Sequence, residues 1–143
     1  MPLAPDKTIL LVEDSPEDRE ATLRAIKKAG LPNPVHWCDN GDKALDYLHR
    51  RGEYADPTKT GRVGVILLDL NMPGTDGREV LSEVTQDPLL KSIPIVVLTT
   101  SSDARDIDAF VASGAKSYIV KPVTQDGIIK AVQKLEQFWS FSF

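Results

Sequence analysis

Acidic residues follow two apolar segments of this 143-residue chain, in places where they could act together. Glu13 and Asp14 come directly after the run Thr8–Val12, and Asp69 comes directly after Val65–Leu68. Short continuous apolar runs of this kind are typical of strands that are covered on both faces. If both strands belong to one parallel sheet, their carboxyl ends meet at one edge. The sequence therefore predicts that these carboxylates converge.

Carboxylates that meet at one point repel one another, so the pKa of at least one of them should rise. A hard divalent cation removes this conflict, and oxygen ligands with room for water suit Mg²⁺. We therefore expect a Mg²⁺ site that includes Glu13, Asp14 and Asp69.

Two more polar side chains are expected at the same edge of the sheet. Thr99 follows the apolar run Ile95–Leu98 with a hydroxyl group, and Lys121 follows Ser117–Val120 with an ammonium group. Lys121 precedes a proline, so the peptide bond between them can be cis. A cation, a hydroxyl and an ammonium group around Asp69 suit a tetrahedral dianion attached to its carboxylate. This pattern indicates attack by Asp69 on a phosphoryl group, which gives an acyl phosphate.

Each of these residues also has a purely structural interpretation. Glu13 and Asp14 could open a helix, where acids are favoured, and Asp69 could cap a turn. Many strands end in a threonine such as Thr99, and a single lysine such as Lys121 is usually solvated. The coincidence of suitable groups at four strand ends favours a functional site.

The elements that must position these residues alternate along the chain. The expected strands are Thr8–Val12, Val35–Cys38, Val65–Leu68, Ile95–Leu98 and Ser117–Val120. The expected helices run from Pro16 to about Ala29 (N-cap Ser15, stop at Gly30), over Gly41–His49, after Gly77, over Asp103–Ser113, and from Thr124 to about Phe138, with a long polar loop at 52–64. The alternation predicts an α/β fold, a doubly wound five-stranded parallel sheet with helices on both faces. Right-handed crossovers leave few strand orders, of which 2-1-3-4-5 is a common one.

Composition excludes several classes of protein. A net charge of −4 argues against direct nucleic-acid binding, which needs a basic face. No apolar run approaches the roughly 20 residues that span a bilayer, and the N-terminus lacks the features of a secretory signal. The only cysteine, Cys38, fits a reducing compartment. We expect one cytoplasmic domain over 1–143, with a core at about 7–138 and an aromatic tail at 139–143.

Five short motifs carry a resemblance to a known family: Leu11–Asp14, Leu68–Gly74 with Asp76 and Gly77, Leu98–Thr100, Gly114 with Ala115, and Lys121 with Pro122. With these motifs the chain resembles the receiver domain of two-component response regulators over nearly its whole length. The resemblance implies the flavodoxin-like receiver fold.

The resemblance also implies a role for each site residue. Asp69 would accept a phosphoryl group from a histidine kinase, and the backbone carbonyl of Asn71 would join Glu13, Asp14 and Asp69 in holding Mg²⁺. Thr99 and Lys121 would bind the phosphoryl oxygens, and Tyr118 matches the switch aromatic of the family. Glu13 stands where the family more often has Asp.

A narrower resemblance rests on the 52–64 loop, Gln86–Pro88, and Leu98–Ser102 with Asp106 and Ile107. These segments look like the stand-alone response regulators that partner cyanobacterial phytochrome kinases. This likeness implies a phosphorylation-driven switch of partner or self-association, in phytochrome light signalling and without an attached DNA-binding domain. It does not imply an enzyme.

The aromatic tail suggests self-association. Trp139, Phe141 and Phe143 alternate with serines, a period that suits an extended segment with one apolar face. The tail could complete the core of its own domain or pack on a neighbour, and exposed rings of this size mark interfaces. We expect a homodimer with two-fold symmetry through the tail and the face of the fourth helix, fifth strand and fifth helix.

Two other functions stay open. The first is a hydrolase of small phosphate esters that works through an aspartyl phosphate. Haloacid-dehalogenase-type phosphatases do this with a second Asp two residues after the nucleophile, where this chain has Asn71. The second is a degenerate receiver that binds partners without being phosphorylated, which the presence of all the site groups disfavours.

Overall fold

The computed structural model describes residues 6–56, 58, 60–70 and 77–142, with side chains described up to residue 135. Five parallel strands form one sheet in the order β2-β1-β3-β4-β5. The strands are β1 (Thr8–Val12), β2 (Val35–Cys38), β3 (Val63–Asp69), β4 (Ile95–Thr99) and β5 (Ser117–Val120). The helices are α1 (Pro16–Lys28), α2 (Gly41–His49), the 3₁₀ helix η1 (Gly52–Tyr54), α3 (Gly77–Gln86), α4 (Ala104–Ala112) and α5 (Gln125–Ser142). The predicted fold class and strand order are confirmed.

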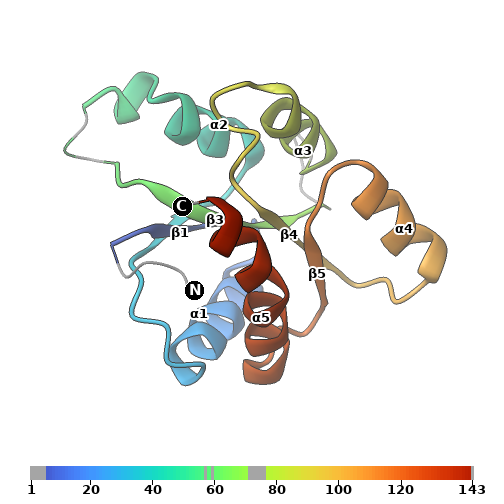
Figure 1. Cartoon of the computed structure of the whole chain (residues 1–143). Coiled ribbons are helices and arrows are strands. Elements are labelled where there is room, and N and C mark those ends of the chain that lie inside the picture. The colour runs from blue at the N-terminus through green and yellow to red at the C-terminus, as the bar shows by residue number, and fades with distance from the viewer. Residues whose placement is uncertain (1–5, 57, 59, 71–76, 143) are drawn as a thin grey trace.

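Helices cover both faces of the sheet, as Figure 1 shows. On β1, Ile9 and Leu11 point toward the core that α1 and α5 complete. Leu10 and Val12 point toward the opposite core, which α2, α3 and α4 complete. Burial on both faces explains why the strands are continuous apolar runs instead of alternating ones.

The register of the central strands brings the functional residues to one edge. Val12 of β1 lies beside Leu68 of β3, so Glu13 and Asp69 are the next residues on neighbouring strands. Asp69 in turn lies beside Leu98 of β4.

The start of α1 confirms the predicted capping. The Ser15 side chain accepts a hydrogen bond from the Asp18 backbone N–H at 3.3 Å, and Pro16 takes the first helical position. The segment between β1 and α1 is therefore short and fixed, and it carries both Glu13 and Asp14.

Two predicted boundaries are wrong. β3 begins at Val63, inside the expected 52–64 loop, because Val63 pairs with Thr8 of β1. The extended aromatic tail is also not observed, since α5 continues to Ser142. No glycine or proline after Gly127 stops the helix, and the five-residue alternation at 139–143 is too short to override it. The packing of the tail side chains lies outside the described residues.

Within the part of the chain that the structure describes, no helix has the length and apolar character to span a membrane. The cytoplasmic location stays a prediction.

Gly77 allows α3 to begin directly against the end of β3. A Cβ at Gly77 would meet the backbone oxygen of Asp69, and would lie 2.6 Å from Cα of Leu70. Because backbone atoms cannot turn aside as a side chain can, we expect Gly77→Ala to lower the free energy of unfolding by about 1–3 kcal/mol in urea titrations.

The matched control is Gly127→Ala in α5, where the nearest atom is Cγ2 of Ile119 at 3.2 Å. That Cβ meets a side-chain methyl group, and alanine is the better helix former. Equal losses of stability in both variants would contradict the assigned role of Gly77.

Candidate functional site

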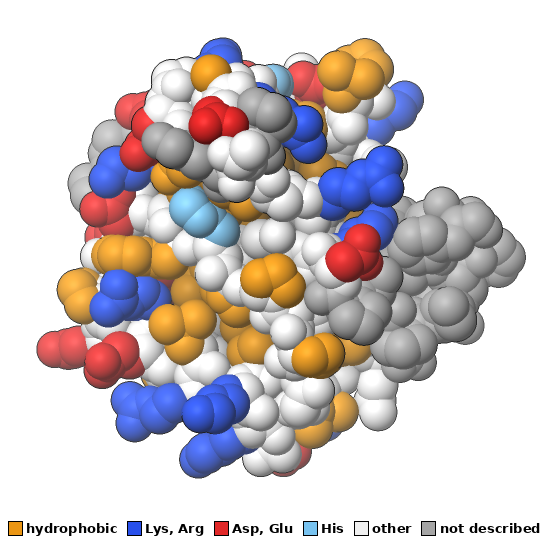
Figure 2. Space-filling view, turned by 90° about the vertical axis from the view of Figure 1, so that its left-hand side faces the viewer, with side chains coloured by type: hydrophobic (Ala, Val, Ile, Leu, Met, Phe, Trp, Pro, Cys, Tyr) orange, Lys and Arg blue, Asp and Glu red, His pale blue; other side chains and the backbone are white. Residues whose placement is uncertain are grey.

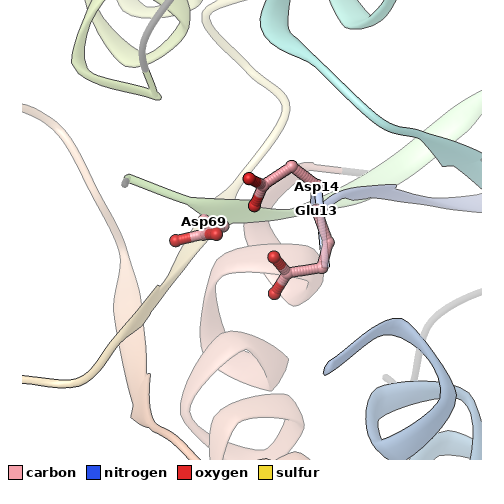
Figure 3. Close-up of side chains that lie close together, drawn as sticks. All are labelled: Glu13, Asp14 and Asp69. Atoms are coloured by element: carbon pink, nitrogen blue, oxygen red, sulfur yellow. The ribbon is translucent and has the colours of Figure 1, made fainter. Parts of the chain in front are cut away.

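Three carboxylates meet at the carboxyl edge of the sheet, as predicted. One oxygen each from Glu13, Asp14 and Asp69 lies within 4.8 Å of the other two. Figure 3 shows the Glu13 and Asp14 side chains leaving the end of β1 in different directions, with both carboxylates on the side of Asp69. Oxygen ligands at this spacing suit a hard divalent cation.

Two of these carboxylates are almost completely removed from solvent. Glu13 is 0% exposed and Asp69 is 3% exposed, and Asp14 is the least buried of the three. The Ser15 backbone N–H donates to Oε2 of Glu13 at 3.3 Å. The local chain thus holds Glu13 inside the site and leaves Asp14 at its mouth.

Lys121 supplies positive charge to this edge. Its Nζ lies 2.8 Å from Oε1 of Glu13, 2.9 Å from Oδ2 of Asp18 and 3.3 Å from Oδ2 of Asp69. Burial alone would lower the pKa of Lys121, but the hydrogen bonds to Glu13 and Asp18 outweigh it and raise that pKa above its usual range. Lys121 therefore keeps its positive charge at neutral pH. The peptide between Lys121 and Pro122 is cis, as the sequence allowed.

Burial, followed by the hydrogen bond with Asp69, raises the pKa of Glu13 to about 8, against the lowering effect of Lys121. One lysine does not balance the acids gathered here, so the site retains a proton near neutral pH. A divalent cation between the carboxylates would relieve the same repulsion. The residues present therefore fit such an ion, which would displace the proton.

Thr99 lies where it was predicted, at the end of β4 and 4% exposed. Its hydroxyl oxygen accepts a hydrogen bond from the Ser101 backbone N–H at 3.0 Å, and its carbonyl accepts from the Lys121 N–H at 2.7 Å. Tyr118 is half-buried on β5, and Nζ of Lys134 lies 5.9 Å from the centre of its ring. The predicted carbonyl ligand, Asn71, lies outside the described residues.

Two residues of the site were not predicted. Asp18 lies in the first turn of α1, and its Oδ2 is 2.9 Å from Nζ of Lys121. Trp37 of β2 donates from its indole N–H to the backbone carbonyl of Glu13 at 2.6 Å. This contact depends on how β2 pairs with β1, which a local sequence pattern does not show.

The Glu13 environment predicts how stability depends on pH. In metal-free protein the pKa of Glu13 is raised from 4.5 to about 8. Between these values the folded state binds up to one proton more than the unfolded state. The free energy of unfolding therefore falls as pH rises, by at most about 1.4 kcal/mol per pH unit. Glu13→Gln carries no charge at any pH and should flatten this slope in urea unfolding with EDTA.

The exposed Glu17 supplies the matched control, Glu17→Gln, which should keep the wild-type slope. Parallel pH profiles for wild type and Glu13→Gln would show that folding does not raise the pKa of Glu13.

A family model described as response regulator receiver domain matches residues 9–133. Response regulator Rcp1 of Synechocystis sp. is 40% identical over 135 residues, which cover 94% of this chain and 90% of Rcp1. A solved structure of the Mn²⁺-bound form of Rcp1 matches with a TM-score of 0.73 and 40% identity, over 93% of this chain and 94% of that one.

Two other solved structures are also similar. The phosphorylated cyanobacterial phytochrome response regulator RcpA matches with a TM-score of 0.75 and 39% identity, over 96% of each chain. The bacteriophytochrome response regulator RtBRR matches with a TM-score of 0.84 and 41% identity, over 91% of this chain and 78% of that one. With its sheet order, its acidic edge and these matches, the chain belongs to the response regulator receiver domain family.

Proposed function

We propose that this protein is a stand-alone response regulator that accepts a phosphoryl group on Asp69 from a histidine kinase. Glu13, Asp14, Asp69 and the backbone carbonyl of Asn71 would hold Mg²⁺. The observation that carries the proposal is the buried carboxylate of Asp69, which lies within 4.8 Å of two other acids and 3.3 Å from an ammonium group. The Mn²⁺-bound form of Rcp1 supports the cation site, and the phosphorylated form of RcpA supports the phosphoryl transfer.

The transfer needs little covalent chemistry from the protein. An oxygen of the Asp69 carboxylate attacks phosphorus, a P–O bond forms, and the P–N bond to the histidine of the kinase breaks. The leaving imidazole retains one nitrogen-bound proton. A bound Mg²⁺ would supply positive charge that offsets the carboxylates and the incoming phosphoryl oxygens. Lys121, directly after β5, supplies positive charge to Asp69, since its Nζ lies 3.3 Å from that carboxylate.

Thr99 links the phosphoryl group to α4. Its hydroxyl accepts from the Ser101 N–H, and the Ser101 hydroxyl donates to Asp106 of α4 at 2.6 Å. When Thr99 turns to donate to a phosphoryl oxygen, the Ser101 contact is given up and the start of α4 is released. Tyr118 then turns inward to fill the space. We propose this two-state movement as the output of the protein.

The relatives support a phytochrome kinase as partner, since RcpA and RtBRR are both named as phytochrome response regulators. The chain also covers 90% of Rcp1, which supports a regulator of this length. We further propose a homodimer through the face of α4, β5 and α5. Val120 of β5 is 36% exposed and lines a hollow there with Gly127 and Lys134 of α5, which supports a contact at this face.

Asp69→Asn should abolish phosphorylation and leave the fold intact, because an amide keeps the shape of the side chain but is a far poorer nucleophile. The measurement is intact mass after incubation with acetyl phosphate and Mg²⁺. Wild type should gain one alkali-labile phosphoryl group per chain. Asp87→Asn, at the end of α3, should behave as wild type.

An adduct on Asp69→Asn at the wild-type rate would contradict the assignment of Asp69. Continuous phosphate release from many esters would instead support the phosphatase, and no adduct on wild type would support the degenerate receiver.

Lys121→Ala should still be phosphorylated on Asp69, but phosphorylation should no longer change its self-association. The reason is that the variant lacks the ammonium group that attracts the phosphoryl oxygens. Sedimentation velocity before and after phosphorylation measures this as a shift toward dimer in wild type and no shift in the variant. Lys27→Ala, on the exposed side of α1 and so outside the proposed dimer face, controls for the loss of one positive charge. A full shift in phosphorylated Lys121→Ala would contradict this route of coupling.

A further inference from the structure

Both polar groups of the Glu13 backbone, its N–H and its carbonyl, make hydrogen bonds to β2. Its N–H donates to the carbonyl of Cys38 at 3.0 Å, which is the last main-chain bond between β1 and β2 at this edge. Its carbonyl accepts the indole N–H of Trp37 at 2.6 Å. The Trp37 side chain therefore adds one hydrogen bond beyond the end of the main-chain ladder.

No main-chain donor on β2 serves this carbonyl in the described structure. β2 ends at Cys38, and Asn40 already caps α2 with its side chain, which accepts from the Lys43 N–H at 2.8 Å. The chain thus leaves the sheet after Cys38, before it can offer a main-chain N–H to the Glu13 carbonyl. A buried carbonyl without a donor would be unfavourable, and Trp37 removes that cost.

The indole is itself fixed in orientation. The guanidinium carbon of Arg19, on α1, lies 4.1 Å from the centre of the Trp37 ring. Nε of Arg19 is buried and has no hydrogen-bond partner, so the ring is the contact that the structure provides for this side of the guanidinium group. Trp37 is half-buried on the edge strand β2. Figure 2 shows hydrophobic side chains that are only partly covered by polar ones on the face that it views.

We propose that Trp37 is a positioning residue for the cation site. Its hydrogen bond holds the peptide that joins Glu13 to Asp14, and this peptide sets the directions in which the two carboxylates leave β1. Trp37 thereby sets how well these carboxylates converge with Asp69 on a divalent cation. The inference rests on the proposed function and adds a residue from β2, the strand that supplies none of the predicted site residues.

Two variants remove the donor. Trp37→Phe removes the N–H and part of the ring, and replacement of Trp37 by 3-benzothienylalanine exchanges only N–H for sulfur and keeps the ring that Arg19 covers. Mg²⁺ affinity, measured by isothermal titration calorimetry at fixed pH, should fall about three- to tenfold in both, as expected for one lost hydrogen bond at the site.

Tyr54→Phe is the matched control. It removes a hydroxyl that lies 3.1 Å from Nε2 of His36, and His36 is on β2 like Trp37 but away from the acids. It should bind Mg²⁺ as wild type does. Urea unfolding in EDTA separates a general loss of stability from a loss of cation affinity.

A spectroscopic signature gives a second readout. Trp139→Phe leaves Trp37 as the only tryptophan of the chain. Because the charge of a cation on Glu13 and Asp14 changes the electrostatic field at the carbonyl that the indole contacts, Trp37 emission should change with Mg²⁺ at the calorimetric midpoint.

Wild-type Mg²⁺ affinity in both Trp37 variants would overturn the inference and leave the proposed function standing. Trp37 emission that does not change at saturating Mg²⁺ would also overturn the inference. Failure of the wild-type protein to bind Mg²⁺ would instead overturn the proposed function, and this inference with it.

Discussion

Repulsion between carboxylates at one edge of the sheet is the constraint on which the site depends. Glu13 and Asp69 are buried side by side, and Asp14 lies at the mouth of the same site. Without a cation, the site is balanced by Lys121 and by a proton that the raised pKa of Glu13 retains. The same excess of negative charge makes the site receptive to a divalent cation, whose charge would in turn offset the negative charge that a phosphoryl group adds.

The fold imposes this crowding and also supports it. Parallel pairing places the ends of β1, β3, β4 and β5 at one edge, and apolar cores on both faces of the sheet hold the strands in register. Charged groups can be packed this closely because the strands that carry them cannot move apart without exposing those cores. A turn of Thr99 at this edge would, as we propose, be passed to α4 through the Ser101 contact with Asp106.

The sequence was sufficient for the strands, their order and the convergence of Glu13, Asp14 and Asp69, because each rests on a local pattern and on the geometry of parallel sheets. The contacts of Trp37 and Asp18 could not be predicted, since they depend on register and on the approach of α1 to β5 over a long stretch of chain. The end of α5 was missed because the alternation at 139–143 suggested an extended tail, although no helix stop precedes it.

The central claim is that Glu13, Asp14 and Asp69 form one cation-binding site at the edge of the sheet. The most direct test is a crystal structure of the protein with Mn²⁺, in which anomalous scattering locates the ion. We predict an anomalous peak enclosed by these three carboxylates, with ligand oxygens of Asp14 and Asp69 at coordinating distance. A well-ordered structure at saturating Mn²⁺ with no peak there, or with the ion held by other residues, would contradict the account.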